Sequence, residues 1–303
     1  MNIQIKKGWL LGILFALLPS ISAANFLDTE IGARQAGMGG TFVGIGDDAS
    51  TIYWNPAGLD ELKNVEIIYL YGRRYNKGGV NFFSLAQPAT SLGGGTWGLF
   101  GLQEDVVEIK DNILRKKGID ETTIGIGWGK KMNGGFEAMP FGLLVGANLK
   151  LLKAEGINNT TRGAAIDLGL LLKPKEILPG TKEIKIGVML RNLLRTRMNE
   201  EKPASGFNLG FGIIMDKKIN LGKGIALSDI ILSADADHPE EESLQIRFGT
   251  EMLVNQKLLW RMGTNNGDIA IGAGITLSQW QIDYGISLNS PNPSHQISAK
   301  LRY

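Results

Sequence analysis

The sequence contains no cysteine and only two histidines, His238 and His295, among its 303 residues. The absence of cysteine excludes disulfide frameworks, thiolate metal sites and cysteine nucleophiles. Two histidines leave little material for a histidine-rich metal site or a catalytic relay, and His238 beside Asp237 is interpreted as a loop residue. We therefore expect a protein that is not an enzyme and that holds neither a metal ion nor another cofactor.

Charge is also scarce and evenly balanced. Charged residues make up 20% of the chain, with 32 lysines and arginines against 30 aspartates and glutamates. A nucleic-acid-binding protein needs a basic surface that displaces counterions. The balance of charges therefore argues against a nucleic-acid partner.

Long apolar runs are missing after the first 24 residues, which excludes a helical membrane protein. The first residues follow a different pattern: Lys6 and Lys7 precede an apolar run over 9–18, and small residues occupy 20–24 apart from Ile21. This order predicts a secretory signal peptide over residues 1–24, cleaved near its end. The mature protein is then expected outside the inner membrane.

From residue 65 onward, the chain alternates apolar residues with polar or small ones. In 268–277, for example, Ile269, Ile271 and Ile275 share one face, and Gly272 and Gly274 share the other. About fourteen such segments occur, separated by turns rich in Asn, Gly, Pro and Asp. The segments are 65–72, 80–86, 96–104, 122–130, 141–153, 162–173, 183–193, 206–215, 229–237, 243–253, 257–264, 268–277, 280–289 and 295–303.

This pattern fits a soluble β-sandwich or solenoid, or an outer-membrane β-barrel. The segment lengths and an even strand number favour the barrel. We predict an all-β fold: a transmembrane antiparallel up-and-down barrel of about 14 strands over residues 63–303. One connection, 216–228, is long for a periplasmic turn, so either it folds inward or the strand count is wrong. The charged residues expected to face the lumen are Asp167, Asp235, Arg247, Asp283, Lys300 and Arg302.

The chain ends on an aromatic residue that completes an alternating segment. Ile297, Ala299, Leu301 and Tyr303 resemble the signal by which bacterial outer-membrane barrels are recognised for insertion. The partners that this implies are outer-membrane lipid and the barrel assembly machinery, and the implied location is the bacterial outer membrane.

A glycine-rich stretch, GARQAGMGGTFVGIGDDASTIYWNPAGL, covers residues 32–59. A phosphate-binding G-x-G-x-x-G loop would need glycine at position 42, which is Phe42. Asp47 and Asp48 would suit acid–base chemistry or calcium, but no further acids stand at calcium-loop spacing, so a helix cap is the simpler interpretation. Asn55 and Pro56 likewise fit an N-cap followed by proline at the first helical position.

The same stretch resembles the N-terminal signature of PorV/PorQ-like outer-membrane proteins, which are relatives of the FadL long-chain fatty acid transporters. The resemblance implies that residues 25–62 form a plug or hatch inside the barrel. The residues that carry it are Gly37, Met38, Gly39, Gly40, Asp47, Asp48, Asn55, Pro56, Ala57 and Gly58.

Two functions follow from this resemblance, both non-enzymatic. The first is a PorV-like role in protein secretion or surface attachment, with secreted proteins or components of a type IX-like system as partners. The alternative is a FadL-like channel for uptake of small hydrophobic molecules, with such a molecule as ligand.

Overall fold

The computed structural model describes residues 30–74, 78–89, 94–110, 113–133, 139–156, 160–175, 178–198, 202–222, 224–240, 242–288 and 293–303. The signal peptide expected over residues 1–24 lies outside the described residues. No helix among the described residues is both long enough and apolar enough to cross a membrane.

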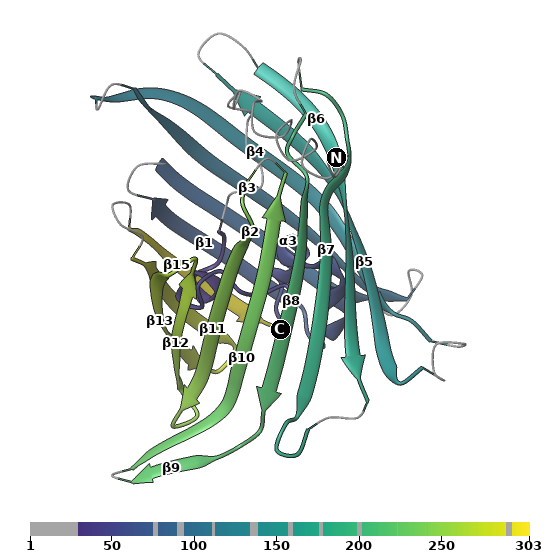
Figure 1. The fold of residues 1–303 in the computed structure, drawn as a ribbon, viewed down its shortest axis with the longest axis vertical. Coiled ribbons are helices and arrows are strands. Elements are labelled where there is room, and N and C mark those ends of the chain that lie inside the picture. The colour runs from purple at the N-terminus through teal and green to yellow at the C-terminus, as the bar shows by residue number, and fades with distance from the viewer. Residues whose placement is uncertain are drawn as a thin grey trace, which may run out of the picture.

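The described chain forms a closed antiparallel β-barrel of fourteen strands with one additional short strand, β9, which confirms the predicted fold (Figure 1). Neighbouring strands pair in chain order, β15 pairs with β1, and β10 pairs with both β8 and β11. The strands are β1 Glu66–Arg74, β2 Gly78–Ala89, β3 Gly95–Lys110, β4 Ile113–Lys131, β5 Phe141–Glu155, β6 Thr160–Pro174, β7 Glu183–Arg195, β8 Gly206–Met215, β9 Ile219–Gly222, β10 Ile225–Pro239, β11 Gln245–Val254, β12 Leu258–Asn265, β13 Asp268–Leu277, β14 Trp280–Ser287 and β15 Ser294–Arg302.

The sequence left two expectations for the long connection after β8: either it folds inward or the strand count is wrong. The structure shows that it does not fold inward. It contains β9, which pairs with the start of β10 so that Ile219 opposes Leu227. Leu221 of β9 is exposed, and Figure 1 shows this hairpin projecting beyond the ends of β8 and β11. The connection therefore adds one short strand to the sheet, while the barrel itself keeps the expected fourteen strands.

β3 and β4 are much longer than their predicted segments, with 16 and 19 residues. Their polar ends break the alternation on which the prediction rested, yet they continue to pair as far as Lys110 and Ile113. Backbone pairing thus extends beyond the part of the hairpin that the apolar pattern marks.

The two faces of the wall differ as the alternation predicts. Outward residues such as Ile271 and Leu277 are apolar and exposed, whereas the predicted inward charges Asp167, Asp235, Arg247, Asp283 and Lys300 are all buried. Arg302 differs from them: its side chain is 42% exposed and pairs with Glu66 at 2.8 Å. Because Arg302 is the last residue of β15, it lies at the barrel end and not within the lumen.

Residues 30–62, here called the inner segment, lie within the barrel (Figure 1). The segment contains two short helices, α2 Ala33–Gly37 and α3 Thr51–Trp54, and a 3-10 helix, η2 Pro56–Glu61. Helices this short are not stable alone, so contacts with the wall must hold them. The indole nitrogen of Trp54 also donates to the carbonyl of Ile31 at 3.1 Å, which ties two parts of the segment together.

Candidate functional site

The inner segment contacts the barrel through glycines of the wall. On eight strands, a Cβ added to an inward glycine would collide with the backbone of the inner segment, and on β6 a Cβ at Gly169 would collide with the side chain of Asn55, so only glycine permits the approach. These residues, here called the glycine belt, are Gly129, Gly146, Gly169, Gly187, Gly210, Gly249, Gly263, Gly272 and Gly285.

Members of the belt are direct cross-strand partners. Gly146 opposes Gly169, Gly249 opposes Gly263, and Gly272 opposes Gly285. Glycines of the inner segment meet the wall in the same way: a Cβ on Gly37 would lie 2.7 Å from the Cα of Gly272. The contact is therefore backbone against backbone over much of the circumference.

β10 has no glycine in the belt and contributes a carboxylate in its place. One oxygen of Asp235 accepts hydrogen bonds from the backbone N–H groups of Phe42 and Val43, at 2.7 and 2.9 Å. Beside it, the hydroxyls of Ser233 and Thr41 are 2.6 Å apart. These bonds anchor the middle of the inner segment to β10.

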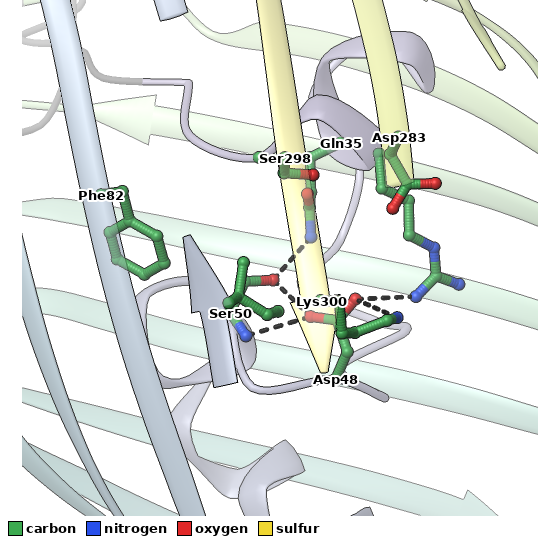
Figure 2. A pocket seen from close by; sticks show the side chains of 10 residues that line it. Gln35, Asp48, Ser50, Phe82, Asp283, Ser298 and Lys300 are labelled. Carbon is green, nitrogen blue, oxygen red and sulfur yellow. Dashed lines mark hydrogen bonds and ion pairs between the residues drawn. The ribbon is translucent and has the colours of Figure 1, made fainter. Parts of the chain in front are cut away.

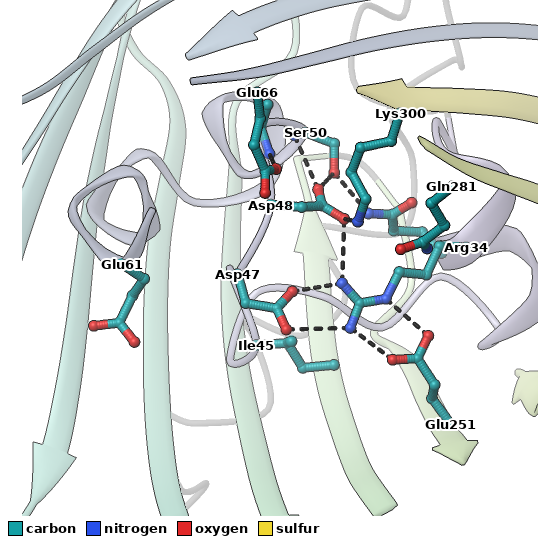
Figure 3. Close-up of polar contacts among 12 residues, drawn as sticks. Arg34, Ile45, Asp47, Asp48, Ser50, Glu61, Glu66, Glu251, Gln281 and Lys300 are labelled. Atoms are coloured by element: carbon teal, nitrogen blue, oxygen red, sulfur yellow. Dashed lines mark hydrogen bonds and ion pairs between the residues drawn. The ribbon is translucent and has the colours of Figure 1, made fainter. Parts of the chain in front are cut away.

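The strongest polar contact between segment and wall centres on Arg34 (Figure 3). Its guanidinium pairs with both oxygens of Glu251 of β11 at 2.8 and 2.9 Å, and with Asp47 and Asp48 at 2.5 and 3.1 Å. Arg34 and Glu251 are both buried. Arg34 therefore offsets the negative charge of carboxylates from both the segment and the wall, and an uncompensated charge in such a buried place is costly.

The network continues into the wall on both sides of Arg34. Glu251 also accepts from Arg261 at 2.5 Å, and Arg261 pairs with Asp283 at 2.8 Å. Asp48 faces Lys300 of β15 at 3.4 Å. Four strands, β11, β12, β14 and β15, thus share one buried charge network with the inner segment.

Asp48 is held charged by its surroundings. Burial raises the pKa of Asp48, but Lys300, Arg34 and two hydrogen bonds from Ser50 outweigh it and leave the pKa well below its ordinary value. A carboxylate fixed in this state does not suit general acid–base work near neutral pH. Among the described residues, no three acids or histidines gather as a metal site.

Asn55 and Pro56 form the start of η2. The side-chain oxygen of Asn55 accepts from the N–H of Ala57 at 3.2 Å, and Pro56 is the first residue of η2. The amide nitrogen of Asn55 donates to the carbonyls of Val43 and Leu170, each at 3.0 Å. One side chain therefore caps the helix and joins the inner segment to β6.

The far end of the inner segment is held by lysines. Glu61 pairs with Lys173 of β6 at 2.8 Å and with Lys185 of β7 at 2.9 Å. Lys185 is buried and also donates to the carbonyl of Ile45 at 3.1 Å.

One sector of the inner wall is apolar. Leu70 of β1, Val80 and Phe82 of β2, and Phe100 and Leu102 of β3 all point inward and are buried. The ring of Tyr53, in the inner segment, lies 6.2 Å from Phe82 and 6.3 Å from Phe100 between ring centroids, both edge-on. An inward apolar sector departs from the polar lumen expected of a porin-like barrel.

Sequence reasoning missed the residues that join segment and wall. Arg34, Glu251 and Arg261 carry no motif, and the belt appears in the sequence only as glycine at alternate positions of many strands. The signal that could have found the belt is that these glycines fall on the face opposite the large apolar residues of each strand.

Comparison with known proteins bears on the fold. No family model and no curated protein matches this sequence. Among solved structures, the chain is similar to the toluene transporter TbuX of Ralstonia pickettii, with a TM-score of 0.52 and 11% identity over 90% of this chain and 98% of that chain. It is similar also to a FadL homologue of Pseudomonas aeruginosa, with a TM-score of 0.52 and 9% identity over the same shares of the two chains. The barrel fold is thus shared with a FadL homologue, while neither structure bears on the PorV/PorQ-like part of the resemblance.

Proposed function

We propose that this chain is an outer-membrane channel for small hydrophobic molecules and that the inner segment is its plug. The observation that carries the proposal is the apolar sector of the inner wall, formed by Leu70, Val80, Phe82, Phe100 and Leu102. The two similar structures, a toluene transporter and a FadL homologue, agree with this substrate class.

The apolar sector needs an explanation because a water-filled lumen would not favour it. Five large apolar side chains facing water would each lose about 1.5–3 kcal/mol of burial free energy. Here they pack against one another and against Tyr53 of the plug. A hydrophobic solute can replace these contacts with its own, whereas a polar solute would have to give up its hydration.

The alternative expected from the sequence, a channel, is therefore the function we propose. A role in protein secretion, which was the first expectation, has no support in the comparisons and no observation in the barrel that favours it. Lipid contact and insertion by the assembly machinery, with Ile297, Ala299, Leu301 and Tyr303 as the signal, accompany the proposal.

The lipid-facing wall predicts a depth-dependent effect of charge. Ile271 and Leu277 both face outward on β13, but Leu277 is the last residue of the strand. We expect Ile271→Arg to lower the free energy of unfolding by about 2–4 kcal/mol and Leu277→Arg by about 0–1 kcal/mol. Urea titration in phospholipid vesicles measures both, and equal losses would contradict a bilayer around this wall.

The channel itself is tested by two adjacent phenylalanines. Phe82 faces inward and is buried, while Phe83 faces outward and is 43% exposed. We expect Phe82→Gln to slow entry of N-phenylnaphthylamine, an uncharged aromatic probe that fluoresces in phospholipid, about tenfold, since an amide in the path adds ~1.4 kcal/mol to the barrier. Phe83→Gln is the matched control and should leave the rate unchanged. Equal rates for both variants, at equal amounts of assembled barrel, would overturn the proposal.

A further inference from the structure

The inner segment is not held equally around the barrel. The glycine belt covers β4–β8 and β11–β14, and Asp235 covers β10. Among the described residues, no glycine of β15, β1 or β2 approaches the inner segment. In that sector, the wall meets the segment through side chains alone.

A small cavity lies in the same sector (Figure 2). Its lining combines apolar, polar and charged residues. The wall contributes Ile68, Phe82, Asp283, Ser298 and Lys300, and the inner segment contributes Gly32, Arg34, Gln35, Asp48 and Ser50. The cavity has room for about one water molecule. A gap between segment and wall thus already exists where the backbone contacts are missing.

The contacts that cross this sector are apolar packing of wall side chains on the inner segment and hydrogen bonds that end in rotatable wall side chains, among them one from Gln296 to the carbonyl of Glu30 at 2.6 Å. Lys300 reaches Asp48 at 3.4 Å, and Glu66 accepts from the N–H of Ala49 at 3.0 Å. By contrast, the polar groups of the segment at the cavity bond to one another. Gln35 donates to the hydroxyl of Ser50 at 2.7 Å, and that hydroxyl donates to Asp48 at 2.5 Å. Widening the gap would leave these internal bonds intact.

The cavity borders the apolar sector of the lumen. Phe82 lines the cavity and is also a member of the apolar sector. Ile68 lies on the same inward face of β1 as Leu70, two residues before it. An apolar solute that reaches the sector through the lumen therefore meets the gap next.

We propose that small hydrophobic molecules pass between the inner segment and the wall formed by β15, β1 and β2, while the glycine belt and Asp235 keep the rest of the segment in place. This inference rests on the proposed channel function. It assigns Ile68 and Phe82 as the lining of the route. It favours narrow, uncharged solutes, because the gap widens only along one side of a fixed segment.

Because the chain has no cysteine, paired cysteines can lock either side of the segment. Gln35→Cys with Ser298→Cys bridges the proposed route, where both residues line the cavity. Thr41→Cys with Ser233→Cys is the matched control on β10, where the two hydroxyls are 2.6 Å apart. The oxidised route pair should abolish N-phenylnaphthylamine entry and reductant should restore it, while the oxidised control pair should keep the unlocked rate.

An equal effect of the two locks would overturn the route, whether both block entry or neither does. If the unmodified protein gave no entry above cells that lack it, the proposed function itself would fail, which separates the two failures.

A second measurement does not depend on disulfide formation or on transport. Ser298 and Ser233 are both wall serines with an exposed fraction of 7%, so Ser298→Cys and Ser233→Cys form a matched pair. We expect a small uncharged alkylating reagent to modify the cysteine at 298 about tenfold faster, because local opening is confined to its sector. Equal rates, or a faster reaction at 233, would overturn the inference.

Discussion

Replacing Arg34 by methionine should release the inner segment while leaving the barrel assembled. The change removes the cation shared by Asp47, Asp48 and Glu251, and it leaves Asp48 with only Lys300 and Glu251 with only Arg261 as charged partners. Removing one member of a buried ion pair costs about 3–5 kcal/mol, and this loss falls on the contact between segment and wall. We expect new chymotrypsin cleavage within the inner segment, at Phe42, Tyr53 or Trp54, and a measurable conductance in planar bilayers.

Two variants control this experiment. Arg302→Met removes an arginine at the barrel end whose side chain is 42% exposed and pairs with the buried Glu66. It should change both readouts much less than Arg34→Met does, because solvent screens the exposed cation. Arg34→Met combined with Glu251→Met removes the uncompensated charge on the wall and should restore part of the protease resistance. If the Arg34→Met protein resisted the protease as well as the parent and conducted no more current than the parent, the network would not be what holds the segment.

The second large effect is expected at Gly39, where valine should prevent the inner segment from docking. Gly39 has a φ of +68°, and a Cβ there would lie 2.6 Å from the backbone nitrogen of Thr264. Valine combines a disfavoured left-handed backbone with overpacking, so we expect a loss of about 3 kcal/mol or more. Heat-modifiable mobility on gels reports barrel assembly, and bilayer conductance reports the open lumen.

Gly101→Val is the matched control for Gly39→Val. Gly101 lies on β3, and a Cβ there would meet nothing within 4 Å. Valine also suits a strand, so this variant should assemble and stay closed. A Gly39→Val protein that assembles and conducts like the Gly101→Val protein would contradict close docking of the segment.

The barrel was predictable from sequence because its physical cause is local. In each strand, alternate residues face outward or toward the lumen, and Ile269 and Ile271 are sufficient to assign the faces of β13. The extra strand β9 was not predictable in this way. Its four residues are too few for alternation to show, and only pairing with β10 forms it.

The site was predictable only where residues act on their own neighbours. Asn55 and Pro56 form a helix start that their order in the sequence indicates. Asp48 shows the limit of such reasoning. One of its oxygens does accept from the N–H of nearby Ser50, but the other faces Arg34 and Lys300, which is 252 positions away. Contacts across that separation depend on barrel closure, which one sequence does not reveal.

The glycine belt illustrates the same limit. A glycine such as Gly187 weakens a strand when it is considered alone, and nothing beside it in the sequence explains its presence. The explanation is the backbone of Val43, which occupies the space of the missing side chain. Two segments that are far apart in the chain have to be brought together before the requirement for glycine becomes visible.

The channel function is tested most directly by comparing entry of two uncharged solutes into cells with and without this protein. One is the apolar N-phenylnaphthylamine and the other is a hydrophilic solute such as a disaccharide. The apolar inner sector and the closed inner segment predict that the protein speeds entry of the apolar probe about tenfold or more and leaves the disaccharide unchanged. Faster entry of the disaccharide alone, or no change for either solute, would contradict a channel for small hydrophobic molecules.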